Sequence, residues 1–235
     1  MVESLTLANT LYRICYVLGF ALTFVFNAVY ARHYRIKAGK AFLFSLVSYL
    51  LIFGWSYVLA WVFNGFRWGH HNAIRVYIWF PAVLFVTAKL FRVDFKDSCE
   101  FFTPSTCIVY GIARLGCIFP GCCYGIPMEH GMYSYAADCR CFPVQLCEAL
   151  TSLLIAVVMV ILARKKHFDS RENTLYPTML VLYGGTRFIW EFFSASKRVL
   201  WNVTELGLWA LATCVMGCVW LLLHAKNKGK APEKR

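Results

Sequence analysis

The stretch YGIARLGCIFPGCCYG, from Tyr110 to Gly125, lies at the end of a long apolar run and has an unusual composition for such a run. Its sixteen residues include one arginine, three cysteines and four glycines. An arginine inside a membrane costs about 2.5–3.5 kcal/mol on insertion scales, so it is usually paired or functional. Two points therefore need an answer: whether the chain lies in a membrane, and what its arginine binds.

The composition indicates a membrane protein. The 235 residues are 60% hydrophobic and only 15% charged, whereas soluble domains contain about 25% charged residues. The apolar residues form seven runs, each long enough to cross a hydrocarbon core of about 30 Å as a helix. These runs lie near 11–30, 41–63, 74–91, 99–119, 142–163, 176–194 and 201–223. We expect an all-α integral membrane protein, with one polytopic domain over 1–235 and a basic tail from about 224.

The distribution of positive charge predicts the topology. Of the 24 lysines and arginines, 16 lie at alternate ends of the runs. The opposite loops hold four, which are Arg67, Arg140, Lys197 and Arg198. By the positive-inside rule, this asymmetry places the N-terminus outside and the C-terminus in the cytoplasm, with seven transmembrane helices between them. The net charge of +12 therefore reflects topology, and we expect no nucleic-acid partner. Because the N-terminus lacks the cationic region of a cleavable signal peptide, we expect the first helix to insert uncleaved.

Four arginines lie inside the apolar runs or at their rims. They are Arg13, Arg75, Arg114 and Arg187. At 1.5 Å per residue, Arg114 is expected about 8 Å below the outer end of its helix, and Arg187 about 10 Å below its own. Glu148 is expected about 9 Å in from the same side. These positions predict a polar cavity that faces outward, in the outer half of the membrane.

The spacing of YGGTRFIWEFF adds to this prediction. Tyr183, Arg187 and Glu191 recur at i, i+4 and i+8, so one helical face presents a phenol, a guanidinium and a carboxylate. One interpretation is an internal Arg–Glu bridge that holds two helices together. The other is a phosphate site, because the planar guanidinium binds phosphate oxygens in a bidentate manner. The natural phosphate at this depth is a lipid headgroup.

The cysteines leave several interpretations open. Six of the eleven are expected on the outer side: Cys117, Cys122, Cys123, Cys139, Cys141 and Cys147. A disulfide, ordinary packing, a redox-active pair or a metal site are all compatible with that side of a bacterial membrane. The CxxxxCC and CxC spacings match no familiar zinc pattern. We therefore expect neither a metal nor an organic cofactor.

Three motifs in order resemble the prolipoprotein diacylglyceryl transferase family. RLGCIFPGCCYG is similar to the arginine-glycine signature of that family, in a variant that carries cysteines. FPVQLCEAL resembles its HPxQLYE segment, and YGGTRFIWEFF resembles its YGxxRFxxEFxR segment. LYRICYVLGF is a weaker likeness to the first-helix segment, and it aligns Tyr12 with a tyrosine of the family. The likeness spans about residues 12–193.

The resemblance implies a reaction and a site. Members of the family move the diacylglyceryl group of phosphatidylglycerol onto the lipobox cysteine thiol of a prolipoprotein signal peptide, in the bacterial inner membrane. By this likeness Arg114 and Arg187 hold the phosphate, while Glu191 and Tyr183 orient Arg187. The remaining substrate-binding positions that it implies are Tyr12, Gly116, Cys117, Gly121, Gly125, Pro143, Gln145 and Glu148.

The chain also departs from the family pattern. The third run lacks the His-Gly-Gly motif whose histidine is a candidate base, and His70 and His71 just before it are the substitutes that the sequence offers. Phe142 replaces the histidine before the proline, and Asn202 and Glu205 stand in the late glutamine-serine segment. Alternative functions are a related transferase with another acceptor and a non-catalytic lipid-binding or transport protein. A third alternative is a thiol-redox protein that uses the outer cysteines.

Overall fold

The computed structural model describes residues 2–34, 36–63, 74–164 and 174–228. Within these ranges the chain forms seven α-helices, one short 3-10 helix and two small β-hairpins. The helices are α1 (Val2–Tyr30), α2 (Ala38–Phe63), α3 (Ile74–Phe91), α4 (Phe95–Gly116), α5 (Val144–Arg164), α6 (Leu175–Glu191) and α7 (Glu205–Lys228). The 3-10 helix η1 is Ala31–Tyr34, and the strands are β1 (Pro127–Ser134), β2 (Cys139–Cys141), β3 (Arg198–Leu200) and β4 (Val203–Thr204).

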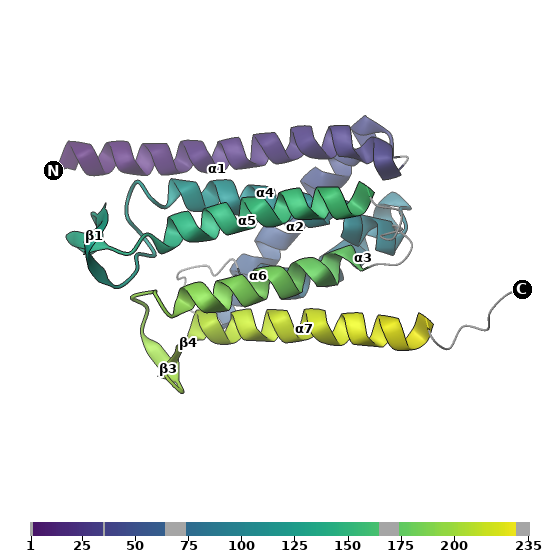
Figure 1. The fold of residues 1–235 in the computed structure, drawn as a ribbon. Coiled ribbons are helices and arrows are strands. Elements are labelled where there is room, and N and C mark those ends of the chain that lie inside the picture. Colours follow the sequence, from purple (N-terminus) through teal and green to yellow (C-terminus); the bar gives the residue numbers. More distant parts are fainter. Residues whose placement is uncertain (1, 35, 64–73, 165–173, 229–235) are drawn as a thin grey trace, which may run out of the picture.

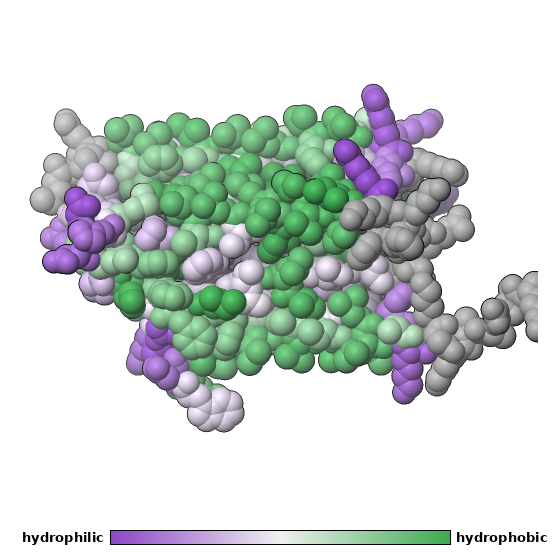
Figure 2. Space-filling view, viewed as in Figure 1, coloured by the Kyte–Doolittle hydropathy of each residue, from purple (hydrophilic) through white to green (hydrophobic). Residues whose placement is uncertain are grey.

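The helices have the character of membrane spans. Four stretches of 21 to 29 residues are long and apolar enough to cross a membrane, and they lie in α1 with η1, in α2, in α5 and in α7. The apolar helix over Val76–Phe91 is shorter. Figure 2 shows a broad hydrophobic surface along the bundle, with hydrophilic residues gathered at its two ends. The expected helical membrane protein is confirmed at this level.

The bundle places both hairpins at one end. In Figure 1 the helices α1, α4, α5, α6 and α7 run side by side, while α2 crosses behind them at an angle. Helix α1 begins at the end that carries β1 and β3. Helix α7 ends at the opposite end.

Close helix contacts depend on glycines at two positions. A Cβ on Gly184 would lie 2.6 Å from the backbone nitrogen of Cys214, so α6 and α7 meet backbone to backbone. A Cβ on Gly111 would lie 2.8 Å from the Leu153 side chain on α5. These contacts bring α4, α5, α6 and α7 close enough for polar side chains to meet between them.

Neutral hydrogen bonds join α1, α2, α3 and α4 deeper in the bundle. The Asn27 amide donates to Ser45 Oγ at 2.9 Å, and Ser48 donates to Thr87 Oγ1 at 3.1 Å. The hydroxyls of Tyr49 and Ser105 lie 3.0 Å apart. All six side chains are buried, and we call these three pairs the neutral seam.

Helix α6 is held at both of its ends. The buried carboxylate of Glu100, on α4, accepts hydrogen bonds from the backbone N–H groups of Thr174 (3.1 Å) and Leu175 (3.3 Å). At the other end, the Arg198 guanidinium donates to the backbone oxygens of Glu191 and Phe192 at 2.9 and 3.0 Å. Both contacts place the charge that the helix dipole favours, an anion at the start and a cation at the end.

Several expected boundaries were wrong. The first helix begins at Val2, well before residue 11, and α4 ends at Gly116 instead of continuing to Phe119. The final run was expected to be helical from Trp201, but a hairpin occupies its start. Trp201 and Asn202 have φ values of +45° and +59°, which a right-handed helix does not allow. A run of apolar residues does not reveal such a turn.

Candidate functional site

Three helices bring their charged residues together near the end of the bundle that carries the hairpins. Arg114 lies two residues before the end of α4, Glu148 lies in the second turn of α5, and Arg187 lies four residues before the end of α6. At 1.5 Å per residue these positions are about 3 to 6 Å from the helix ends. All three therefore lie closer to the ends than the expected 8 to 10 Å, because α4 and α6 end earlier, and α5 begins later, than the apolar runs indicate.

Glu148 joins the two arginines. Its Oε2 lies 2.7 Å from Arg114 Nε, and its Oε1 pairs with Arg187 Nη1. The carboxylate is buried and Arg187 is only 4% exposed. The sequence predicted that Glu148 lines the pocket, whereas the structure makes it the shared counter-ion of both guanidinium groups.

Arg187 has a second carboxylate one turn along its own helix. Its Nη2 pairs with Glu191, and the Thr204 hydroxyl donates to Glu191 Oε2 at 2.5 Å. Tyr183, Arg187 and Glu191 are all buried on one face of α6, as the i, i+4, i+8 spacing predicted. We call Arg114, Glu148, Arg187 and Glu191 the ion cluster.

Arg114 contacts its neighbours through one nitrogen of its guanidinium group. Arg114 Nε donates to the Tyr110 hydroxyl at 2.8 Å, and that hydroxyl donates to Glu148 Oε2 at 3.1 Å. Both contacts of Arg114 with the ion cluster use Nε. The terminal nitrogens of Arg114, which is 13% exposed at its side chain, can therefore reach an acceptor outside the cluster.

Three tyrosines surround the ion cluster. The ring centroids of Tyr77 and Tyr183 lie 4.2 Å apart, and those of Tyr110 and Tyr183 lie 5.2 Å apart. Tyr77 comes from α3, Tyr110 from α4 and Tyr183 from α6. The three phenols are buried, so aromatic walls exclude water from the side of the cluster that they cover.

The loop after α4 folds back over this end of the bundle. Gly121 has a φ of +69°, and a Cβ there would lie 2.6 Å from Ser134 Oγ. A Cβ on Gly125 would lie 2.5 Å from the backbone oxygen of Phe142. Gln145 Nε2 donates to the backbone oxygen of Cys122 at 2.6 Å and fixes the loop to α5. Glycine is needed at both positions because backbone atoms leave no room for a side chain.

The other implied substrate-binding residues lie around the same end. Gly116 packs on α1, where an added Cβ would lie 2.9 Å from Cys15 and 3.2 Å from the Tyr12 backbone oxygen. Pro143 lines a small pocket with Gln145 beneath the β1–β2 hairpin. Cys117 is buried at the end of α4.

The outer cysteines are free thiols in the part of the chain that the structure describes. Cys139 Sγ and Cys141 Sγ lie 3.5 Å apart on β2. In the loop after α4, a hydrogen bond from the Cys122 thiol and, to a smaller extent, the positive charge of Arg114 together lower the pKa of Cys123 to about 5. The described residues contain no group of three ligands that suits a metal ion.

Some predicted residues do not join the ion cluster. Arg13 is exposed on α1, and no ion pair to it is found among the described residues. The side chain of Arg75 lies outside the description, as do His70 and His71. Asn202 is exposed at the tip of the β3–β4 hairpin, and Glu205 accepts a hydrogen bond from Trp209 instead of facing the cluster.

Sequence reasoning missed three residues of the site: Tyr77, Tyr110 and Thr204. Tyr110 had a detectable signal, because YGIAR and YGGTR place Tyr-Gly-x-x-Arg in both arginine helices. In each case the tyrosine lies one turn from the arginine, on the same helical face. Thr204 and Tyr77 carried no such signal, since they reach the cluster only through the packing of other helices.

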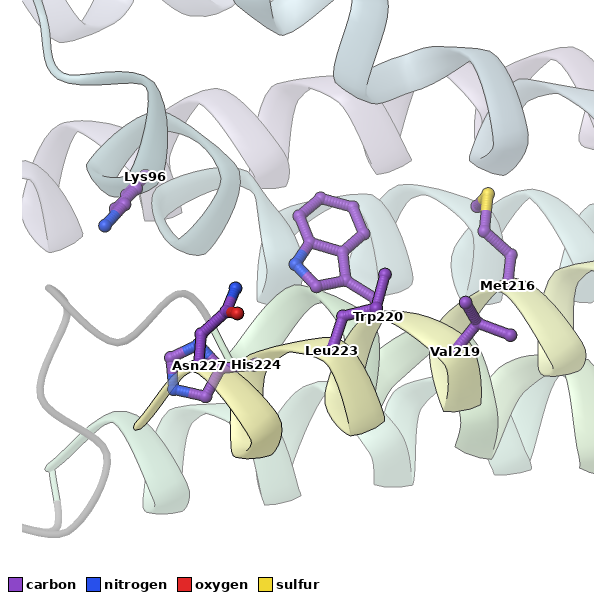
Figure 3. Close-up of a pocket in the computed structure, with 7 residues that line it drawn as sticks. All are labelled: Lys96, Met216, Val219, Trp220, Leu223, His224 and Asn227. Atoms are coloured by element: carbon purple, nitrogen blue, oxygen red, sulfur yellow. The ribbon is translucent and has the colours of Figure 1, made fainter. Parts of the chain in front are cut away.

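A groove elsewhere on the bundle lies far from these residues. It has a volume of about 470 Å³ and follows α7 from Met216 to Asn227. Figure 3 shows Lys96 near His224 and Asn227 at one end of this groove, with Met216 at the other. Lys96 and Arg114 are eighteen residues apart on α4, or about 27 Å along the helix. The groove is therefore separate from the ion cluster.

The geometry defines a class of protein: a helical membrane protein with paired arginines buried near one end, beside a tight glycine-rich loop. The family profile described as prolipoprotein diacylglyceryl transferase matches residues 2–224. The chain belongs to this family, as the motifs predicted. It is also 27% identical, over 134 residues, to the phosphatidylglycerol–prolipoprotein diacylglyceryl transferase of Clostridium tetani (strain Massachusetts / E88). That match covers 54% of this chain and 49% of the relative, so it spans about half of each protein.

Proposed function

We propose that this protein transfers the diacylglyceryl group of phosphatidylglycerol to the lipobox cysteine of a prolipoprotein. The observation that carries the proposal is the ion cluster, in which a single carboxylate holds two arginines from different helices. Family membership supports it, and the relative from Clostridium tetani bears the name of this reaction.

The topology that fits this function has seven spans, with the N-terminus outside and the C-terminus in the cytoplasm. The chain then forms one membrane domain of the bacterial inner membrane. The ion cluster lies near the bundle end that carries the N-terminus and both hairpins, which becomes the outer leaflet. In this orientation an outward-facing cavity at the cluster receives both the phospholipid and the signal peptide of a secreted preprotein.

The arginines suit the phosphate of the donor. Arg114 offers its terminal nitrogens, and a planar guanidinium binds phosphate oxygens in a bidentate manner. Arg187 is fixed by Glu148 and Glu191, so it is already oriented before the lipid binds. Fixed positive charge in a site without bulk water stabilises a leaving group as it develops negative charge.

The reaction requires one bond to form and one to break. The peptide cysteine loses its proton, and its sulfur attacks the glyceryl carbon that carries the phosphate ester. A carbon–sulfur bond forms, the carbon–oxygen bond breaks, and the electron pair leaves with glycerol phosphate. In this proposal Arg114 and Arg187 stabilise the departing phosphate, while Tyr183 and Glu191 keep Arg187 in place. The proton acceptor that we propose is His70 or His71, which lie outside the described residues.

The remaining residues shape the pocket in this proposal. Gly121 and Gly125 allow the loop after α4 to lie against the bundle, and Gln145 holds that loop through Cys122. Tyr12 and Gly116 close the boundary between α1 and α4. Cys117 and Pro143 line the same end, and no protein thiol takes part in the transfer.

The test is thiol lipidation in vesicles with labelled phosphatidylglycerol and a lipobox peptide. We expect the wild-type protein to lipidate the cysteine peptide and not its serine version. Arg114→Gln is the informative variant, because Glu148 keeps its partner Arg187 and the helices remain paired. It should reduce transfer by about 100-fold, which corresponds to the loss of one stabilising donor. Lys197→Gln, an exposed cation of the same end, is the control and should leave transfer unchanged.

A second candidate function is non-catalytic binding or transport of phospholipid. The absence of histidine from α3 favours it, because the family places its candidate base there. This candidate predicts that phosphatidylglycerol binds in an Arg114-dependent manner while no thiol is lipidated. A related transferase would instead label a different acceptor, which the same donor would reveal in a membrane extract.

A further inference from the structure

Tyr77 is the residue through which α3 reaches the surroundings of the ion cluster. Its ring lies 4.2 Å from that of Tyr183 and 6.1 Å from that of Tyr110, measured between centroids. The side chain is 3% exposed. A hydrogen bond of 2.6 Å from the Tyr176 hydroxyl to the Tyr77 backbone oxygen fixes this part of α3 against α6.

The Tyr77 hydroxyl is buried without a hydrogen-bond partner among the described residues. The same holds for the Tyr183 hydroxyl and for Arg187 Nε. A buried donor without an acceptor costs free energy, so folded proteins contain few of them. Three such donors on neighbouring side chains indicate a ligand that supplies the missing acceptors.

Other buried tyrosines of this protein are paired. The hydroxyl of Tyr49 lies 3.0 Å from Ser105 Oγ, and that of Tyr176 donates to the Tyr77 backbone. Tyr110 bridges Arg114 and Glu148. Of the five buried tyrosines compared, only Tyr77 and Tyr183 have a hydroxyl without a hydrogen-bond partner among the described residues. Both lie beside the ion cluster.

The donors point to an anionic ligand with several oxygens. A phenol with an ordinary pKa near 10 keeps its proton at neutral pH and donates a hydrogen bond. Phosphate oxygens accept several such bonds at once and carry the charge that Arg187 favours. We propose that Tyr77 is a phosphate-binding residue, whose hydroxyl donates to the phosphate of the lipid donor. This inference rests on the proposed function and assigns to α3 a role that its sequence does not suggest.

The experiment compares Tyr77→Phe with Tyr49→Phe. Both variants remove one buried hydroxyl and keep the ring, but only the Tyr49 hydroxyl has a partner within the protein. Binding of phosphatidylglycerol, and separately of glycerol phosphate, is measured on the detergent-solubilised full-length protein, alongside the melting temperature without ligand. Thiol lipidation is measured with the same samples.

We expect Tyr77→Phe to bind both ligands about tenfold more weakly and to melt at the wild-type temperature or above, because an unsatisfied hydroxyl has been removed. Tyr49→Phe should melt at a lower temperature and bind with unchanged affinity. Unchanged affinity in Tyr77→Phe, while Arg114→Gln loses it, would overturn the role of Tyr77 and leave the proposed function intact. Ligand binding that depends on Tyr77 but no lipidation would overturn the transferase and retain this inference. A wild-type protein that binds neither ligand would overturn both.

Discussion

The neutral seam and the ion cluster are two ways of burying polar side chains in the same bundle. In the neutral seam, Asn27, Ser48 and Tyr49 each meet a hydroxyl of another helix. In the ion cluster, Glu148 is shared by two arginines, and beside it the hydroxyls of Tyr77 and Tyr183 have no hydrogen-bond partner among the described residues.

In our proposal the difference separates a structural role, in the neutral seam, from a binding role, in the ion cluster. In the neutral seam each hydroxyl meets a neutral partner on another helix, and Asn27 Oδ1 is the one side-chain atom of these six residues that is buried without a partner among the described residues. The ion cluster is balanced in charge, but Arg187 Nε has no hydrogen-bond partner among the described residues. The contacts of Arg114 with Glu148 and Tyr110 use its Nε. Stability and ligand binding should therefore depend on different residues, and each of the following predictions tests that separation.

The largest expected effect is on Glu148. Replacing Glu148 with alanine removes the common counter-ion of Arg114 and Arg187, and a buried charge without its partner costs about 3–5 kcal/mol. We expect a large loss in the free energy of unfolding, measured by denaturant titration in mixed micelles. Glu129→Ala, an exposed acid on β1, is the control. Equal stability of the two variants would contradict the ion cluster.

The contact between α6 and α7 should be the next most sensitive. Gly184→Ala places a Cβ 2.6 Å from the backbone nitrogen of Cys214 and 2.7 Å from the backbone oxygen of Ala210, where neither atom can move away alone. Such overpacking costs about 1–3 kcal/mol. The adjacent Gly185 has no atom within 4 Å of its would-be Cβ, so Gly185→Ala should be neutral or stabilising by up to about 1 kcal/mol. The same unfolding assay checks both, and the opposite order would disprove the close contact.

A smaller effect is expected in the neutral seam. Ser48→Ala removes one donor to Thr87 Oγ1 and should cost about 1 kcal/mol of stability. Lipid binding and thiol lipidation should remain at wild-type levels, since this pair lies away from the ion cluster. A loss of binding at unchanged stability would show that the two regions are coupled.

The smallest effect on stability is expected at Cys123. Because its pKa is lowered to about 5, chiefly by the hydrogen bond from Cys122, the thiolate is populated above that pH. Alkylation by iodoacetamide should therefore stay fast at pH 6, where an ordinary thiol of pKa near 8.5 is protonated. Mass spectrometry of the modified peptide, with Cys123→Ser as the control, measures this rate. A rate that falls away below pH 8.5 would show that the pKa is not lowered.

Sequence patterns predicted the helices better than the connections between them. Long apolar runs indicate helices because a membrane leaves no other way to satisfy the backbone. The β3–β4 hairpin was missed, since Val199, Leu200 and Trp201 are as apolar as a helix of this bundle. Only the left-handed backbone of Trp201 and Asn202 distinguishes it.

The charged residues of the site could be predicted, and its neutral ones could not. Arg114, Glu148 and Arg187 stand out because charge inside an apolar run is rare. Thr204 and Tyr77 are ordinary residues in such runs, and their proximity to the cluster follows only from how α3, α6 and α7 pack. The shared Glu148 was also beyond prediction, because a sequence does not give the distances between helices.

The double fixation of α6 has a mechanical consequence. Glu100 holds the first N–H groups of this helix, and Arg198 holds its last carbonyls. Arg187 therefore lies on a helix that is held at both ends, by Glu100 of α4 at the start and by Arg198 of the β3–β4 hairpin at the end. These two sets of hydrogen bonds fix the position of the Arg187 guanidinium along the helix axis, so this position does not depend on the length of the connection before α6. Loss of either the Glu100 or the Arg198 contact would let α6 shift along its axis. The Arg187 guanidinium would then move out of position although no residue in contact with it had changed.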